Sequence, residues 1–261
     1  MRNNSTWAPS ALLPTNWPRE SWNPILATLT LVAAVVILFL VQTGYAVFGL
    51  RVSHAFTFEQ LQTQTLPPTQ MMLLQFISFT PIVIFLLLVL PLLAKRPLSQ
   101  LGFRVPTGRD LMVAVAGAVA MAIAVDGSGS VLAEVFHRHD TEQAVVLLKS
   151  LKTPSQQLLF FLLACIFAPF SEELLFRVFI YNALTRYVPI AVAAVVSGVL
   201  FGLLHLTGGG LEIVTVAVPL MLGGIILAYV YAETKCFWAN VTTHALFNSI
   251  SVASFFLLHA S

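Results

Sequence analysis

Residues 156–186 read QQLLFFLLACIFAPFSEELLFRVFIYNALTR, and this segment combines the apolar character of a membrane helix with three clustered charges. Glu172, Glu173 and Arg177 fall within six residues of one another, and the 19 residues between Lys152 and Glu172 carry no charge. A charge at the centre of a bilayer costs about 2.5–3.5 kcal/mol on insertion scales. We therefore expect these three side chains to have partners or a function inside the membrane.

The composition as a whole is that of a membrane protein. Of the 261 residues, 58% are hydrophobic and 9% are charged, whereas a soluble domain carries roughly 25% charged residues. The net charge is +2, and no basic stripe indicates binding to nucleic acid. The two cysteines, Cys165 and Cys236, have no metal-binding or redox spacing, so we interpret them as packed free thiols.

Seven apolar windows are long enough to cross a bilayer, since a spanning helix needs about 20 apolar residues. An eighth span is possible if residues 140–153 enter the membrane, but residues 141–151 also fit a short helix lying on its surface. The fold class is therefore all-α, a polytopic transmembrane bundle of about seven or eight spans. The seven windows are 21–50, 60–94, 111–134, 156–186, 188–206, 213–232 and 237–258.

The chain divides into a polar leader (1–24), N-terminal transmembrane helices with their linkers (25–154) and a core (155–258). The first apolar run is too long for the h-region of a signal peptide, so we expect an uncleaved anchor. With seven spans and a cytoplasmic N-terminus, eight Lys and Arg residues fall on the inside and four on the outside. This asymmetry favours that orientation, although an eighth span would reverse the second half.

The spacing of the three charges predicts one internal ion pair. Residues four apart share a helix face, so Glu173 is placed to pair with Arg177, while Glu172 lies about 100° around the helix. Pro169 stands three residues before Glu172. Because proline has no N–H, it frees a backbone carbonyl and is expected to kink the helix just before the glutamates.

Two further polar groups lie in later apolar windows. His205 follows Phe201 by four residues, and His244 precedes Asn248 by four, so the last two share a helix face. A carboxylate in an apolar site is a general base for water, and a histidine can orient that water or move a proton. A His–Asn pair can donate hydrogen bonds to an oxyanion. Together these groups could hydrolyse an amide through an activated water.

Simpler interpretations of the same residues remain open at this point. The Glu173–Arg177 pair can be purely structural, and a lone histidine in a core is usually packed and bonded to a carbonyl. One Glu with two His could also hold zinc, because three protein ligands and a water suffice. The spacing does not decide this, since those ligands come from three separate helices.

The three motifs resemble those of the CPBP family of intramembrane glutamic proteases, also called the CAAX prenyl protease 2 or Abi family. Its motifs are Glu-Glu-x-x-x-Arg, Phe-x-x-x-His and His-x-x-x-Asn, in this order on successive membrane helices. The resemblance covers roughly residues 155–258, and Leu101-Gly102-Phe103 resembles a segment that precedes the family's core. One departure is Val178, which stands where the family often has glycine after the motif arginine.

This resemblance implies an intramembrane endopeptidase that needs neither cofactor nor metal. Its substrate would be a membrane-associated or lipid-modified peptide, its other partner the lipid bilayer, and its location a bacterial cell membrane crossed several times. The implied roles are water-activating base for Glu172, water holder for His205, oxyanion site for His244 and Asn248, and support for Glu173 and Arg177.

Two other classes of function fit the sequence less well. A catalytically idle immunity or partner protein would keep the same motifs for structural reasons. A proton-coupled transporter also uses intramembrane Glu and His residues, but transporters are usually built from two related halves. Here the clustered polar groups lie in one half of the chain only.

Overall fold

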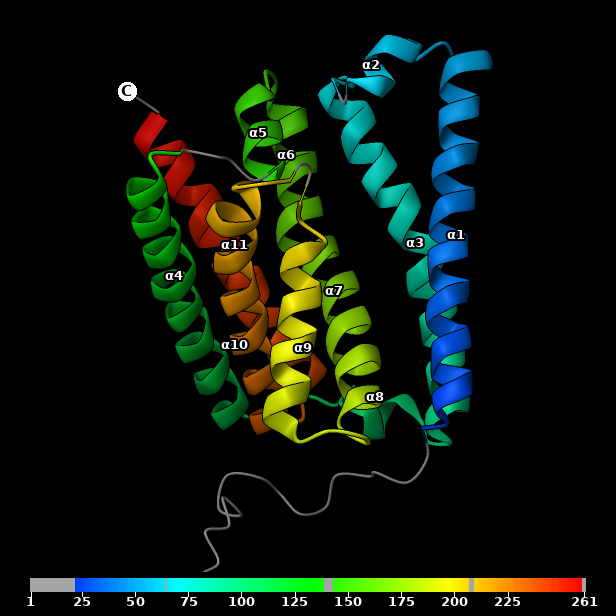
Figure 1. The fold of residues 1–261 in the computed structure, drawn as a ribbon, viewed down its shortest axis with the longest axis vertical. Helices are drawn as coiled ribbons and strands as arrows, with labels where there is room; N and C mark the ends of the chain where they lie inside the picture. The colour runs from blue at the N-terminus through cyan, green and yellow to red at the C-terminus, as the bar shows by residue number, and fades with distance from the viewer. Residues whose placement is uncertain (1–21, 64, 139–142, 207–208, 260–261) are drawn as a thin grey trace, which may run out of the picture.

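The computed structural model describes residues 22–63, 65–138, 143–206 and 209–259, and the regular structure within these ranges is entirely helical (Figure 1). Most of the predicted leader, residues 1–24, lies outside them. The elements are α1 (Pro24–Arg51), α2 (Phe58–Gln62), α3 (Pro68–Ala94), η1 (Leu98–Leu101), α4 (Gly108–Phe136), α5 (Gln143–Ser150), α6 (Pro154–Leu162), η2 (Leu163–Phe167), α7 (Ala168–Glu173), η3 (Leu174–Tyr181), α8 (Asn182–Leu184), α9 (Ile190–Leu203), η4 (Ile213–Ala217), α10 (Val218–Thr234) and α11 (Phe237–His259).

Among the described residues, five helices are long and apolar enough to cross a membrane. They are Pro24–Arg51, Pro68–Ala94, Gly108–Phe136, Pro154–Leu184 and Ile213–Thr234. The other two predicted windows contain α9, a shorter apolar helix of 14 residues, and α11, with 23 residues. Within the segment considered for an eighth span, α5 has 8 residues. At 1.5 Å per residue α5 is only about 12 Å long, against a hydrocarbon core of about 30 Å, so α5 does not form that span.

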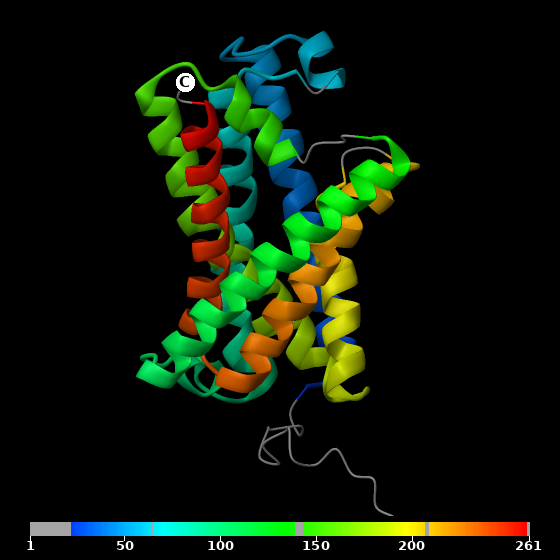
Figure 2. The same ribbon diagram turned by 90° about the vertical axis from the view of Figure 1, so that its left-hand side faces the viewer.

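The helices that carry the polar motifs pack together in the middle of the bundle. In Figure 1, α10 stands beside α9, α9 stands beside the helix formed by α7 and η3, and α1 with α3 forms a pair at one side of the molecule. Figure 2 shows α4 crossing the bundle obliquely over α10. Helix α11 packs against α4, α7 and η2, so it lies next to the segment that holds the glutamates.

Three glycines let α9 and α10 approach each other closely. A Cβ at Gly198 or Gly202 would lie 2.6 Å and 2.5 Å from side-chain atoms of Ile225 and Met221, and one at Gly224 would lie 2.8 Å from the Gly198 Cα. Gly198 and Gly202 are four residues apart, a spacing of small residues that recurs at contacts between membrane helices. This contact fixes the depth of Phe201, which lies between the two α9 glycines.

A loop between α3 and α4 anchors the turn that joins α10 to α11. The Phe237 N–H donates to the Gly102 carbonyl at 2.8 Å, and the Tyr231 hydroxyl donates to the Leu101 carbonyl at 3.0 Å. Gly102 has φ +96°, a left-handed conformation that favours glycine. Phe103 stacks on Phe237 with ring centroids 4.3 Å apart. The Leu101-Gly102-Phe103 segment therefore sets where α11 begins.

An ion pair strengthens the same anchor. Arg104 binds both carboxylate oxygens of Asp110, at 2.7 Å and 3.0 Å, and also donates to the Thr234 carbonyl at the end of α10. The hydrogen bond to Asp110 raises the pKa of the Arg104 guanidinium above its ordinary value. Next to this contact, burial lowers the pKa of Lys235 to about 8.

Candidate active site

The two glutamates lie in a long helix, Pro154–Leu184, in a short α-helical stretch that is flanked by two π-helical segments. Glu172 and Glu173 end α7, and π-helical segments precede and follow this short stretch, at Leu163–Phe167 and Leu174–Tyr181. A π-helical turn widens the backbone and is often found at functional sites. Pro169 was expected to disturb the helix just before the glutamates. The disturbance is the π-helical segment Leu163–Phe167, which ends shortly before Pro169.

Glu173 is held by three donors in a fully buried position. Its Oε1 accepts from the Arg177 Nη1 at 3.0 Å and from the His244 Nδ1 at 2.9 Å, and its Oε2 accepts from the Asn240 Nδ2. The side chains of Glu173 and Arg177 are both 0% exposed. The ion pair expected from the spacing is thus present, with two further donors on the carboxylate.

Arg177 is fixed by contacts on two other helices. Its Nη2 donates to the Gly224 carbonyl on α10 at 2.8 Å. Its guanidinium carbon lies 4.9 Å from the ring centroid of Phe201 on α9, a cation–π contact. The guanidinium therefore joins the glutamate helix to α9 and α10, and its charge balances that of Glu173.

His244 lies between the two glutamates. Its Nδ1 donates to Glu173, and its Nε2 is 3.8 Å from the Glu172 Oε2. A carboxylate can only accept, so the proton of a neutral His244 sits on Nδ1 and the lone pair on Nε2 faces Glu172. The imidazole thus connects a buried carboxylate with one that is reachable, since the Glu172 side chain is 13% exposed.

His205 lies just past the end of α9. Its Nδ1 is 2.9 Å from the Phe201 carbonyl, which only accepts, so a neutral His205 also presents the lone pair of its Nε2. The Phe201 ring is 4.8 Å from the His205 ring and 5.7 Å from the His244 ring, centroid to centroid. Phe201 therefore brings the two imidazoles to the same part of the bundle.

Asn248 is one turn beyond His244 on α11 and points to the glutamate helix. Its Nδ2 donates to the Ala164 carbonyl in the η2 turn at 2.7 Å. One of its two N–H bonds is used in this way, and the second is available to a further acceptor. The structure thus brings Glu172, Glu173, Arg177 and His244 together. The Phe201 ring links His205 to this group, and Asn248 is linked to it because it lies on the same helix as His244.

Asn240 is a member of the site that was not predicted from the sequence. This residue is four positions before His244, so the spacing Asn240, His244, Asn248 places three polar side chains on one face of α11. The periodicity was a usable signal for this face. It did not show that Asn240 meets Glu173, because that contact depends on how α11 is placed against α7.

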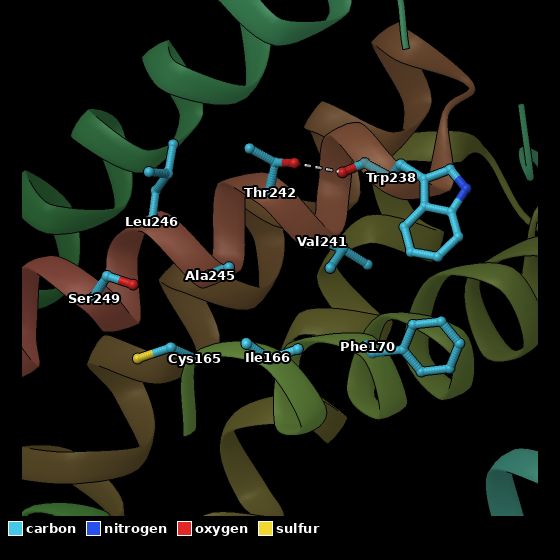
Figure 3. A pocket seen from close by; sticks show the side chains of 9 residues that line it. All are labelled: Cys165, Ile166, Phe170, Trp238, Val241, Thr242, Ala245, Leu246 and Ser249. Atoms are coloured by element: carbon cyan, nitrogen blue, oxygen red, sulfur yellow. Dashed lines mark hydrogen bonds between the residues drawn. The ribbon is translucent and has the colours of Figure 1, made fainter. Parts of the chain in front are cut away.

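An apolar groove of about 280 Å³ lies on another face of the same helix pair (Figure 3). Cys165, Ile166 and Phe170 form one wall and α11 side chains the other, with Phe170 and Trp238 at one end and Ser249 at the other. Three of the α11 residues in the groove, Val241, Ala245 and Ser249, directly follow Asn240, His244 and Asn248 in sequence, about 100° around the helix. The groove and the polar site therefore occupy different faces of α11.

Residues 154–250 match the model of a family described as “Type II CAAX prenyl endopeptidase Rce1-like”. All three polar motifs and the site above fall within this match. This segment of the chain is therefore similar to the Rce1-like family. The resemblance noted from the motifs is thereby confirmed.

The chain is also similar to a protein of Bacillus subtilis (strain 168) named “Putative membrane peptidase YdiL”. The two are 27% identical over 177 residues, which make up 67% of this chain and 68% of the relative. No solved structure gives a significant match. The long apolar helices and the family together describe an integral, multi-pass membrane protein.

Proposed function

We propose that this protein is an intramembrane endopeptidase, in which Glu172 activates a water that attacks a peptide bond. One observation carries the proposal: the two neighbouring glutamates have different surroundings. Glu173 is 0% exposed and binds three donors, whereas Glu172 is 13% exposed and faces the His244 Nε2. Glu172 is therefore the carboxylate that a water and a substrate can reach.

The first step is proton removal from water. Glu172 takes a proton as the water oxygen attacks the carbonyl carbon, and the proton is later given to the leaving amine. His205 supports this step because its Nε2 can accept a hydrogen bond from the same water and direct a water lone pair at the substrate. A positioned general base contributes about 10²–10⁴-fold in rate.

The second step is stabilisation of the oxyanion. Asn248 has one N–H left for this purpose. His244 can donate from Nε2 only as an imidazolium, since its Nδ1–H is already bound to Glu173. The proton lost by the water can therefore move between Glu172 and His244 during the reaction.

The substrate in this proposal is a membrane-associated or lipid-modified peptide, and the protein crosses a bacterial cell membrane seven times. The family's description, which names a CAAX prenyl endopeptidase, supports the substrate class, and the bacterial relative supports the location. No nucleic acid, cofactor or metal takes part. Helices α9 and α11 are the two crossings beyond the five long apolar helices.

The test is cleavage by purified protein in liposomes, with quenched fluorescent peptides that do or do not end in a farnesylated cysteine tail. Glu172→Gln should reduce cleavage about 10²–10⁴-fold. Glu134→Gln is the control, because it makes the same change at an exposed position at the end of α4. Wild-type activity should survive chelation of metals. Cleavage by Glu172→Gln at the wild-type rate would contradict the mechanism, and a wild-type protein that cleaves neither peptide would favour an idle partner protein.

A further inference from the structure

Asn240 is a fully buried amide that belongs to none of the three polar motifs. It lies on α11 with 0% exposure, and its Nδ2 donates to the Glu173 Oε2. Its Oδ1 makes no hydrogen bond within the described residues. Leaving the Asn240 Oδ1 buried without a hydrogen bond costs free energy. The contact of its Nδ2 with Glu173 therefore calls for an explanation.

The orientation of this amide is set by Glu173. An ionised carboxylate has no proton to give, so only the NH₂ end of Asn240 can face it. Arg177 and His244 bind the other oxygen, Oε1, at 3.0 Å and 2.9 Å. Asn240 is thus the single described donor to Oε2, and it prevents the carboxylate from rotating away from His244.

The consequence reaches His244. While Glu173 is ionised and held in this rotamer, the proton of His244 is drawn to Nδ1 and its Nε2 lone pair faces Glu172, 3.8 Å away. We propose that Asn240 is a positioning residue that fixes the ionised Glu173 and, through it, the tautomer of His244. Its effect on rate rests on the proposed peptidase function, while its effect on the tautomer does not.

Several charged and titratable groups surround this arrangement. Glu172 and Arg177 come from the same helix as Glu173. His205 lies beyond the Phe201 ring at the end of α9, and Tyr231 comes from α10, where its hydroxyl donates to the Leu101 carbonyl. Asn240 itself does not titrate, which makes an acid at this position an informative probe.

The first experiment replaces Asn240 with aspartate and with leucine and records the pH profile of cleavage of the farnesylated peptide. A protonated aspartate can donate its O–H to Glu173, whereas an ionised one opposes it and removes the donor. Asn240→Asp should therefore be active at low pH and lose at least about tenfold as the pH rises, reversibly. Asn240→Leu should be at least about tenfold slower at every pH.

Asn182→Asp is the matched control, because Asn182 is a buried amide 1% exposed that binds the Tyr231 hydroxyl. Asn182→Asp should change the stability of the protein without adding a new pH-dependent change in the rate of cleavage. A profile of Asn240→Asp that runs parallel to the wild type would overturn the proposal. If Asn240→Leu gives no folded protein, Asn240→Asp at low pH still decides the question.

The second experiment reads the tautomer directly, by NMR of protein with ¹⁵N-labelled histidine, with His244 assigned through His244→Gln. The wild type should carry the proton on Nδ1, and Asn240→Asp at high pH should show a mixture of tautomers. An unchanged tautomer would overturn the proposal even if catalysis falls. Because this measurement needs no turnover, it remains decisive if the peptidase function itself fails.

Discussion

The amide nitrogen of Asn248 lies 2.7 Å from the carbonyl oxygen of Ala164. In the π-helical turn of η2 the Ala168 N–H binds the Leu163 carbonyl, five residues back. The next donor in this pattern would be residue 169, which is a proline and has no N–H. Pro169 thus leaves the Ala164 acceptor to Asn248, and a backbone irregularity in one helix becomes the attachment point for another.

This relationship predicts energetic coupling between Pro169 and Asn248. Asn248→Ala should destabilise the protein by about 1–3 kcal/mol, because it leaves the half-buried Ala164 carbonyl without its hydrogen bond. In a Pro169→Ala background the new N–H of residue 169 can donate to the Ala164 carbonyl. Asn248→Ala should then lower the free energy of unfolding by less than it does in the wild type. A double-mutant cycle in a denaturant titration measures the difference. Pro91→Ala in α3 is the control background, and strictly additive effects of Pro169→Ala would disprove the coupling.

Glu173→Ala and Arg177→Ala should both reduce folded yield in membranes. Each leaves the partner charge buried without its counterion, which costs about 3–5 kcal/mol. The double variant should cost less than the two single changes together, because no lone charge remains. Thermal unfolding in detergent provides the measurement. As the control, Glu172→Gln should unfold close to the wild-type temperature. A wild-type unfolding temperature for Arg177→Ala would mean that the Glu173–Arg177 pair does not contribute to stability.

The contact of α9 with α10 predicts that Gly198 cannot carry a larger side chain. Gly198→Ala should destabilise by about 1–3 kcal/mol, since backbone atoms of α10 lie 2.8 Å from the added carbon and must move. It should also lower activity by shifting Phe201. Gly127→Ala on α4 is the control, because nothing lies within 4 Å of its added carbon. Equal stabilities of the two variants, measured by unfolding, would contradict the close approach.

Lys235 predicts a pH dependence of stability. Burial lowers its pKa to about 8, against about 10.4 for an unperturbed lysine. Between these values the unfolded chain binds more protons, so stability rises as the pH rises from 8 towards 10. Lys235→Gln lacks this contribution. In thermal unfolding, Lys235→Gln should be more stable than the wild type at pH 7, and this difference should be smaller at pH 9.5. A difference in stability that stays constant with pH would show that the pKa of Lys235 is not lowered.

Sequence reasoning succeeded where the signal is local to one helix. Apolar length located the helices, the four-residue spacing gave the Glu173–Arg177 pair, and the missing N–H of Pro169 indicated a freed carbonyl. It could not give the position of His244 between both glutamates or the contact of Asn240. Both depend on the rotation and depth of α11 against α7, which are set by distant contacts such as Gly102 with Phe237.

The division of the site between α7 and α11 has a consequence for biosynthesis. Glu172, Glu173 and Arg177 leave the ribosome 63 to 72 residues before Asn240 and His244. During that interval the glutamate helix enters the membrane without the donors of α11. The Glu173–Arg177 pair can already form, because both residues belong to one helix. Arg177 therefore neutralises the charge of Glu173 while this helix inserts into the membrane. The site is complete only after α11 has packed against α7.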